Sequence, residues 1–295
     1  MDVTSLCYGC AAAFARPLIT DTQAVDLFRR VYDLGIRFFD TGHNYGRAEE
    51  RIGMALRQNS DIDRKSIIIS TKCGSRIVND KKVHDVSVDW IKESVETSLK
   101  RMGISYIDIL YLHGPSYADI HNDGLLQLLQ DMKSSGLIRA TGANTFNSKV
   151  ISSIAREKQF DVVMLDYNII KQRREPEIQA LYDSGIGVVA GQALAESVFS
   201  NSLYKIRSKK DIWYLARTIG RKASRKLFLE GRKFRFLNQL KEPDGTQVAL
   251  KYVLDNPCIS AASFGTCSFD HLSKNVSSLD ITIPEDVLQK IRSAR

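Results

Sequence analysis

Short apolar runs and amphipathic stretches alternate along almost the whole chain. The apolar runs predict buried strands at residues 6–9, 36–39, 67–71, 107–112, 138–142, 162–166, 186–190 and 259–262. Between them, apolar residues recur at helical spacing over residues 22–34, 48–57, 87–101, 123–135, 148–157, 174–184 and 245–255. Strands that alternate with helices predict parallel strands joined by helical crossovers.

Eight strands with seven crossovers favour the α/β class and a closed (β/α)8 TIM barrel, here as a single domain over residues 1–295. No GxGxxG motif follows any predicted strand, which counts against an open dinucleotide-binding sheet. Two segments stand outside the repeat. Residues 204–241 form a basic helical insert after the seventh strand, and the tail from Pro284 carries apolar residues at the spacing of a C-terminal helix.

Composition narrows the class of protein further. Apolar residues make up 43% of the 295 residues and charged residues 26%, as in ordinary globular proteins. No run of 18 apolar residues exists, so we expect no membrane span. The N-terminus lacks the layout of a signal peptide, so a cytoplasmic protein is the expectation.

The five cysteines are an odd number, which argues against a disulfide framework. Cys7 and Cys10 have the spacing of a metal-binding or redox pair. Neither a second cysteine pair nor a nearby histidine completes a tetrahedral site, so we expect no metal.

Polar residues follow three of the predicted strands directly. Asp40 and Tyr45 lie in the loop after the second strand, Lys72 ends the third, and His113 ends the fourth. Active sites of (β/α)8 barrels lie at the C-terminal ends of the strands, so these four residues predict an acid–base site. Each alone has a structural interpretation as a cap, a surface charge, a loop aromatic or a buried histidine, and their common location favours the site.

Several motifs along the chain resemble those of the aldo-keto reductases. They are Gly35 to Gly46 with Glu49, Ser70-Thr71-Lys72, Leu112-His113-Gly114-Pro115, Lys133 to Gly142, Tyr167-Asn168, Ala249 to Asn256, and Phe264-Gly265-Thr266 with Leu272 and Asn275. Each motif is weak by itself, but their order along nearly the whole chain is specific. The resemblance implies reduction of an aldehyde or ketone by a nicotinamide dinucleotide.

This chemistry gives each of the four residues a role, and the resemblance implies the same roles. Hydride transfer leaves negative charge on the carbonyl oxygen, and Tyr45 is the expected proton donor. A free tyrosine has a pKa of about 10, and an ammonium such as that of Lys72 stabilises a neighbouring phenolate. Asp40 would hold Lys72 by a charge-assisted hydrogen bond, and His113 would orient the carbonyl oxygen.

The expected cofactor site departs from the family pattern. Asn144 and Thr145 follow Ala143 where the family has a Ser-Asn pair, and Met164 stands where the family has a glutamine. Gly191 and Gln192 take the place of an aromatic residue or an arginine near the nicotinamide. We therefore expect the nicotinamide to be held by fewer contacts than is usual for the family.

The region after the eighth strand is expected to bind the cofactor phosphates. Gly265 and Thr266 suit a turn that phosphate approaches closely. His271 and Lys274, aligned from Asn275, keep the basic character of this region in a rearranged order. We therefore favour NADP, as NADPH, over NAD.

Two other classes of function stay open. The barrel could bind a nucleotide with little turnover and serve as a regulatory or scaffold subunit. The net charge of +8 and pI near 9.2 raise nucleic-acid binding, but no RNP, KH or zinc-finger motif supports it. The loop after His113 and the insert are expected to wall the pocket, with Tyr8 and His43 at its rim. The sequence leaves the carbonyl substrate and the oligomeric state open.

The insert is strongly basic. Between Lys205 and Lys241 its acids are Asp211 and Glu230, and the aromatic residues Trp213, Tyr214, Phe228, Phe234 and Phe236 are interleaved with lysine and arginine. One interpretation is a helical excursion whose aromatics pack on the barrel. The other is a lid whose cations clamp the cofactor phosphates or an anionic substrate.

Overall fold

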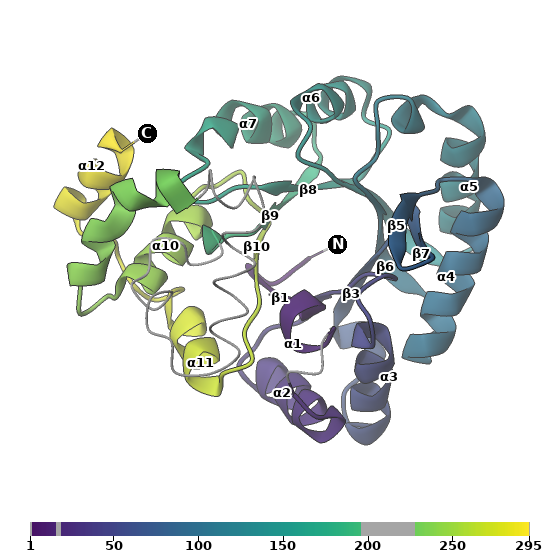
Figure 1. The fold of residues 1–295 in the computed structure, drawn as a ribbon, viewed down its shortest axis with the longest axis horizontal. Coiled ribbons are helices and arrows are strands. Elements are labelled where there is room, and N and C mark those ends of the chain that lie inside the picture. Colours follow the sequence, from purple (N-terminus) through teal and green to yellow (C-terminus); the bar gives the residue numbers. More distant parts are fainter. Residues whose placement is uncertain (1, 16–18, 196–227, 295) are drawn as a thin grey trace.

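The computed structural model describes residues 2–15, 19–195 and 228–294 as a closed barrel surrounded by helices (Figure 1). The barrel strands are β1 (Leu6–Gly9), β2 (Phe38–Asp40), β3 (Ile68–Cys73), β6 (Ile107–His113), β7 (Ile138–Asn144), β8 (Val162–Asp166), β9 (Gly187–Gly191) and β10 (Ala261–Phe264). They pair in parallel in the order β1-β10-β9-β8-β7-β6-β3-β2, which closes on itself. The predicted barrel is confirmed.

The crossover helices lie within one residue of their predicted bounds. They are α2 (Asp21–Asp33), α3 (Ala48–Gln58), α4 (Val88–Met102), α5 (Asp123–Ser134), α6 (Ser148–Glu157), α7 (Glu175–Asp183) and α10 (Gly245–Leu254). Local signals define their ends. Asp244 and Gln247 form a capping box at the start of α10, and Gly103 ends α4 in the left-handed conformation. The predicted C-terminal helix is α12 (Glu285–Ser293).

Several elements were not predicted. These are the helices α1 (Cys10–Ala13) and α11 (Phe269–Ser277), the 3-10 helices η1 (Arg64–Ser66), η2 (Asp119–His121) and η3 (Gln172–Arg174), and an antiparallel hairpin of β4 (Ser75–Val78) and β5 (Lys81–His84). Asn79 and Asp80 join the hairpin with φ of 49° and 59°. Two central residues with positive φ are the signature of a type I′ turn. The hairpin stands in front of the barrel in Figure 1.

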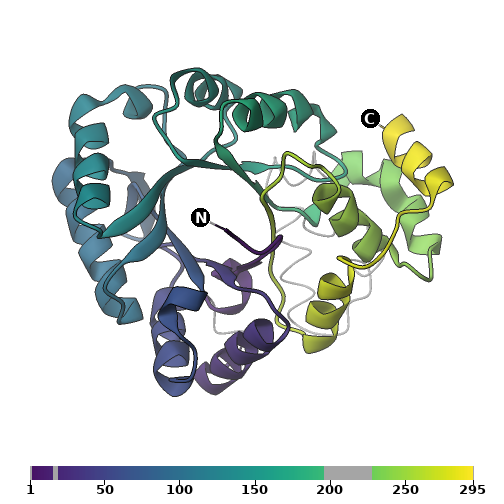
Figure 2. The same ribbon diagram turned by 180° about the vertical axis from the view of Figure 1, so that it is seen from behind.

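The barrel interior is filled in layers because alternate residues of each strand point inward. One apolar cluster consists of Cys7, Phe38, Ile68, Ile109, Tyr111, Ala140, Met164, Val189 and Ala261. Two of its large side chains lie against glycines. A Cβ on Gly142 would come within 2.4 Å of the Tyr111 ring, and one on Gly191 within 3.3 Å of Met164 Cγ. Val3, which precedes β1, packs partly buried against the same cluster. The N-terminal segment that carries it enters the barrel from the side seen in Figure 2.

The predicted insert is described only from residue 228 onward, and residues 204–227 lie outside the described part of the chain. In the described part, η6 (Arg232–Gln239) buries Phe234 and Leu237 against the core, and Phe228 and Phe236 pack partly against it. In this part the aromatic side chains pack on the barrel, as expected for a helical excursion that is held by its aromatics. The proposed lid with cations that clamp phosphate lies largely on residues that the structure does not describe.

Asp108 ties neighbouring segments together between the barrel and its outer shell. Its fully buried carboxylate accepts hydrogen bonds from Arg64 Nη2 at 2.6 Å, Arg139 Nη1 at 2.8 Å and the backbone N–H of Ile69 at 2.9 Å. We expect Asp108→Ala to lower the free energy of unfolding by about 1–3 kcal/mol, because it leaves the buried N–H of Ile69 and the partly buried guanidinium of Arg64 without their acceptor. Urea denaturation measures this, with the exposed Asp286→Ala on α12 as the control. A loss equal to that of the control would contradict the assignment.

Candidate active site

Three of the four predicted acid–base residues point into the mouth of the barrel. Asp40 lies two residues after Phe38, Lys72 four after Ile68, and His113 four after Ile109, and these partners belong to the interior cluster. The two-residue period of a strand therefore turns all three side chains inward. They come from the neighbouring strands β2, β3 and β6, so the structure brings them together.

Lys72 and Asp40 form a buried ion pair. Lys72 Nζ lies 2.5 Å from Asp40 Oδ2 and donates a second hydrogen bond to the carbonyl oxygen of Thr41 at 2.7 Å. The hydroxyl of Ser70 donates to the other Asp40 oxygen at 2.7 Å. Burial works to lower the pKa of Lys72, but the adjacent carboxylate of Asp40 outweighs it and raises the pKa to about 12. Lys72 is therefore an ammonium at any physiological pH.

The loop after β2 places Tyr45 beside this ammonium. The backbone N–H groups of Thr41 and His43 donate to carbonyl oxygens of β3, which fastens the first half of the loop. The loop then folds back, because the N–H of Tyr45 donates to the carbonyl of Gly42 at 2.8 Å. A Cβ on Gly42 would lie 3.3 Å from the ring of Tyr45, so the ring rests on the glycine backbone. Lys72 Nζ is 4.9 Å from the centre of that ring.

His113 also lies close to Tyr45. The two ring centres are 6.1 Å apart and the planes are nearly perpendicular at 87°. Burial lowers the pKa of His113 to about 3, with further contributions from the ammonium groups of Lys82 and Lys72. The imidazole is therefore neutral at neutral pH and has one N–H to donate.

This pKa has a consequence for stability. Between pH 6.5 and about 3 the unfolded chain binds a proton at His113 and the folded chain does not, so the stability of the fold decreases as the pH falls below 6.5. We expect wild type to lose up to about 1.4 kcal/mol per pH unit more than His113→Asn does in this window. Urea denaturation at pH 7, 6, 5 and 4 measures it. Parallel curves for the two proteins would show that His113 titrates normally.

Two residues expected at the pocket rim are buried, so that prediction is wrong. Tyr8 is fully buried, and its hydroxyl donates to the carbonyl of Thr266 at 2.6 Å. His43 shares a hydrogen bond of 3.3 Å with Ser98 and packs edge-on against Trp90. Tyr8 thus holds the backbone at Thr266, and His43 attaches its own loop to α4.

Sequence reasoning missed Lys82, which the hairpin brings to the site. Its Nζ lies 3.4 Å from Nδ1 and 3.5 Å from Nε2 of His113. Asn44 donates to the backbone and the side chain of Ser75, at 2.7 and 2.9 Å, and so joins the loop of Tyr45 to the start of the hairpin. The β-branched residues around Asn79-Asp80 were the signal that could have revealed the hairpin.

The predicted nicotinamide residues surround the same mouth. Asn144 pairs with His113 in the β6–β7 register, and its side-chain amide donates to the carbonyl of Met164 at 3.3 Å. The hydroxyl of Thr145 accepts from the N–H of Asn147 at 3.2 Å. Met164 is buried in the barrel interior and occupies space beside Gly191.

Gln192 is exposed directly after β9, with a positive φ of 57°. Its carbonyl oxygen accepts a hydrogen bond from the side chain of Asn168 at 3.0 Å. The backbone at the end of β9 is thus held from β8, while the Gln192 side chain faces solvent.

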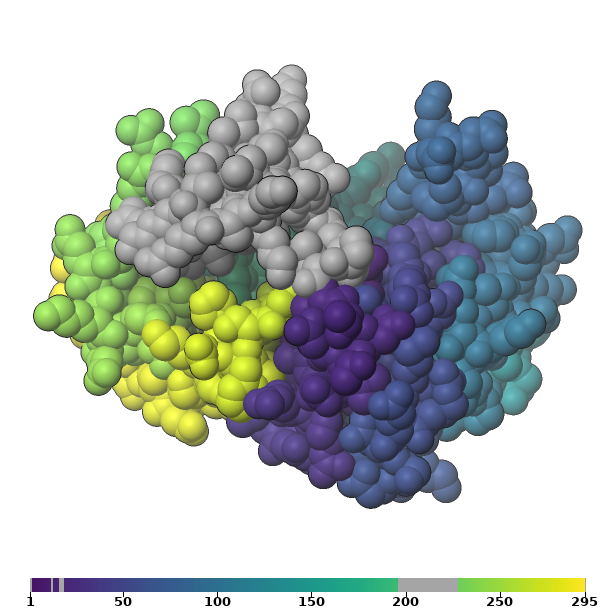
Figure 3. Space-filling model, turned by 60° about the horizontal axis from the view of Figure 1, so that its bottom comes forward, coloured from purple at the N-terminus to yellow at the C-terminus, as the bar shows by residue number. Residues whose placement is uncertain are grey.

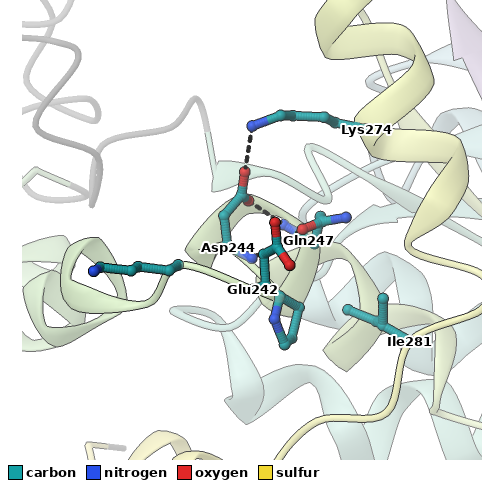
Figure 4. Close-up of a pocket in the computed structure, with 7 residues that line it drawn as sticks. Glu242, Asp244, Gln247, Lys274 and Ile281 are labelled. Carbon is teal, nitrogen blue, oxygen red and sulfur yellow. Dashed lines mark hydrogen bonds and ion pairs between the residues drawn. The ribbon is translucent and has the colours of Figure 1, made fainter.

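The predicted phosphate residues lie after β10 and on α11. Gly265 is exposed and Thr266 half-buried; Asn275 is buried, whereas His271 is exposed in the first turn of α11. Lys274 is not free: its Nζ lies 3.1 Å from Asp244 Oδ2 across a surface hollow of about 320 Å³ (Figure 4). This hollow lies between α10 and α11 and is lined by none of the four acid–base residues.

Comparison with known proteins identifies the family. The Aldo/keto reductase family profile matches residues 5–295, so the chain belongs to this family of oxidoreductases. The structure is similar to the aldo-keto reductase AKR11C1 from Bacillus halodurans in its holo form, with a TM-score of 0.79 and 24% identity, covering 99% of this chain and 92% of that one.

Related sequences carry several functions. The chain is 25% identical to "Uncharacterized oxidoreductase YqkF" of Bacillus subtilis (strain 168), covering 99% of this chain and 93% of that protein. It is 24% identical to L-glyceraldehyde 3-phosphate reductase of Escherichia coli (strain K12), covering 86% and 78%. It is 26% identical to "Probable voltage-gated potassium channel subunit beta" of Oryza sativa subsp. japonica, covering 99% and 93%. The family and the oxidoreductase relatives support reduction of a carbonyl with a nicotinamide cofactor.

No described helix is both long and apolar enough to cross a bilayer. In the same part of the chain, no three metal-binding side chains of His, Cys, Asp or Glu converge on one point. Cys7 faces the barrel interior and Cys10 packs in the outer core. Burial raises the pKa of both thiols, which makes them poor nucleophiles and metal ligands.

Proposed function

We propose that this protein reduces an aldehyde or ketone to an alcohol, with Tyr45 as the proton donor. The observation that carries the proposal is the convergence of Tyr45, the buried Lys72–Asp40 pair and His113 on one point at the barrel mouth. A bound nicotinamide dinucleotide would supply the hydride to the carbonyl carbon. The electron pair of the C=O bond then moves onto the oxygen, which takes the proton of the Tyr45 hydroxyl.

The surrounding groups prepare Tyr45 for this transfer. Lys72 lies 4.9 Å from the ring and stays protonated, so its charge favours the phenolate that remains after the proton has left. Asp40 holds the ammonium in place through a buried, charge-assisted hydrogen bond. Neutral His113 would donate its N–H to the carbonyl oxygen from the other side, which orients the carbonyl without competing for the proton.

The chain's residues suit a nicotinamide dinucleotide, and we propose NADPH. Asn144 lies beside His113, where its amide could bond to a carboxamide. The first turn of α11 offers backbone N–H groups and the exposed His271, a combination that favours phosphate. Gly265 and Thr266 would form the turn before it. In this arrangement Thr145 and Gln192 lie nearer the nicotinamide, whereas Lys274 and Asn275 lie nearer the adenosine end.

Lys274 tests the preference for NADPH. If it shifts from Asp244 to the extra phosphate, Lys274→Ala should weaken NADPH binding roughly two- to fivefold and leave NADH binding unchanged, the scale of an exposed ion pair. Lys290→Ala is a matched control, because Lys290 is 59% exposed against 61% for Lys274 and lies 3.1 Å from Asp286. Fluorescence titration gives both constants. Equal weakening for the two cofactors would remove Lys274 from the phosphate site.

A second candidate is a regulatory subunit with little turnover, favoured by the likeness to the rice protein named as a channel subunit. The decisive assay follows NADPH absorbance with a panel of short aldehydes, ketones and their anionic derivatives. Turnover well above that of Tyr45→Phe supports the reductase. Tight cofactor binding with no turnover beyond that of this variant would favour the regulatory subunit.

A further inference from the structure

The hairpin presents one face to the site. Lys82 pairs with Ile77 across the two strands, and Ser75 pairs with His84 two residues away, so these four side chains share that face. His84 fastens it, because its Nε2 lies 2.8 Å from Oδ2 of Asp119 in the loop after β6. In Figure 3 the blue part of the chain, which includes the hairpin, projects at the upper right.

Among the described residues, Lys82 differs from the neighbouring cations Lys72 and Arg76 in having no acidic partner. Lys72 is paired with Asp40, and Arg76 lies 3.0 Å from Asp85. Within residues 2–15, 19–195 and 228–294, no carboxylate forms an ion pair with Lys82. Its positive charge next to the site is therefore not neutralised by that part of the chain.

The contact with His113 does not satisfy Lys82 either. Nζ is almost equally far from the two ring nitrogens, at 3.4 and 3.5 Å, so it is not aligned with the lone pair of either one. An ammonium has three N–H donors. Donors of Lys82 are thus available to a ligand that lies against His113.

The electrostatics point to an anion. The Lys82 side chain is exposed, and partial desolvation and the charge of Lys72 lower its pKa from the usual value. Both lysines also lower the pKa of the His113 imidazole. An anion at Lys82 would relieve these repulsions together.

We propose that Lys82 is the anion-binding residue of the substrate pocket, and that the substrates are short carbonyl compounds with a carboxylate or phosphate near the reacting carbonyl. This rests on the proposed reduction at Tyr45 and His113. Lys82 touches the ring that would hold the carbonyl oxygen, so only a few bonds can separate the two groups of the substrate. Ile77, 55% exposed on the same face, offers an apolar surface to the carbon atoms between them.

The kinetic test compares matched pairs: glyceraldehyde 3-phosphate with glyceraldehyde, and 4-carboxybenzaldehyde with benzaldehyde. Wild type should prefer the charged member of at least one pair in kcat/KM. Lys82→Met should lower the ratio of charged to neutral substrate roughly 10- to 100-fold, the scale of a charge-assisted hydrogen bond. Lys82→Arg should retain most of it. Lys81→Met should behave as wild type, because Lys81 lies on the other face of the hairpin. An unchanged ratio in Lys82→Met overturns the proposal.

A binding test separates this proposal from the proposed reaction. The Cε1–H resonance of His113 is followed by NMR while inorganic phosphate or acetate is added to the NADPH-bound protein. A saturable shift in wild type and in Lys81→Met, absent in Lys82→Met, supports the subsite even if no carbonyl is reduced. A response to phosphate alone identifies phosphate-bearing substrates, and a response to acetate alone identifies carboxylates. Equal shifts with and without Lys82, or no shift with either anion, overturn the subsite.

Discussion

Tyr45→Phe is expected to lower kcat at least 100-fold and to leave the dissociation constant for NADPH nearly unchanged. The substitution removes only the hydroxyl, and the ring can keep its place on the backbone of Gly42. General acid catalysis contributes about 10²–10⁴-fold, so the loss should fall in that range. Turnover is followed by NADPH absorbance on a verified substrate, and cofactor binding by fluorescence.

Tyr182→Phe is the matched control for this variant. Tyr182 lies on α7 and is 53% exposed, so loss of its hydroxyl should change neither kcat nor stability measurably. If Tyr45→Phe turned over as fast as this control, another group would have to be the proton donor.

Lys72→Met is expected to be as inactive as Tyr45→Phe, but with a changed pH dependence of the residual kcat. Without the ammonium the phenolate loses its stabilising charge, so the high-pH limb of the residual kcat profile should move to higher pH. The variant should also lose about 3–5 kcal/mol of stability, because the carboxylate of Asp40, 5% exposed, keeps its charge without its partner.

The double variant Asp40→Asn/Lys72→Met separates the two effects. It removes both charges, so it should recover most of the stability that Lys72→Met loses and stay inactive. Urea denaturation measures the stability, and steady-state kinetics over pH 5–9 measure the activity. A double variant that regained activity along with stability would assign Lys72 to the fold alone, as would a single-variant profile that only scaled in height.

The barrel and the placement of Asp40, Lys72 and His113 at its mouth could be predicted from the sequence because their signals are local. Each strand is a short apolar run, and each polar side chain stands at a fixed distance from its end. Lys72 and His113 point inward because they keep the two-residue period of Ile68 and Ile109. Neighbouring strands of a parallel barrel then bring such residues to the same end.

What could not be predicted depends on contacts between distant segments. Tyr8 lies behind the mouth because its hydroxyl meets the carbonyl of Thr266, 258 residues away. Lys274 is paired because α10 presents Asp244 to it. Lys82 was one of many lysines in the sequence, and only the fold of the hairpin sets it against His113. No pattern along the chain carries these contacts.

The barrel interior also limits how this sequence can change over time. Tyr111 occupies the space that any Cβ at residue 142 would need. A Cβ at residue 191 would be in close contact with Met164. Positions 111 and 142 are therefore expected to covary among descendants of this chain. A smaller residue must replace Tyr111 before Gly142 can be exchanged, since the reverse order passes through an overpacked core.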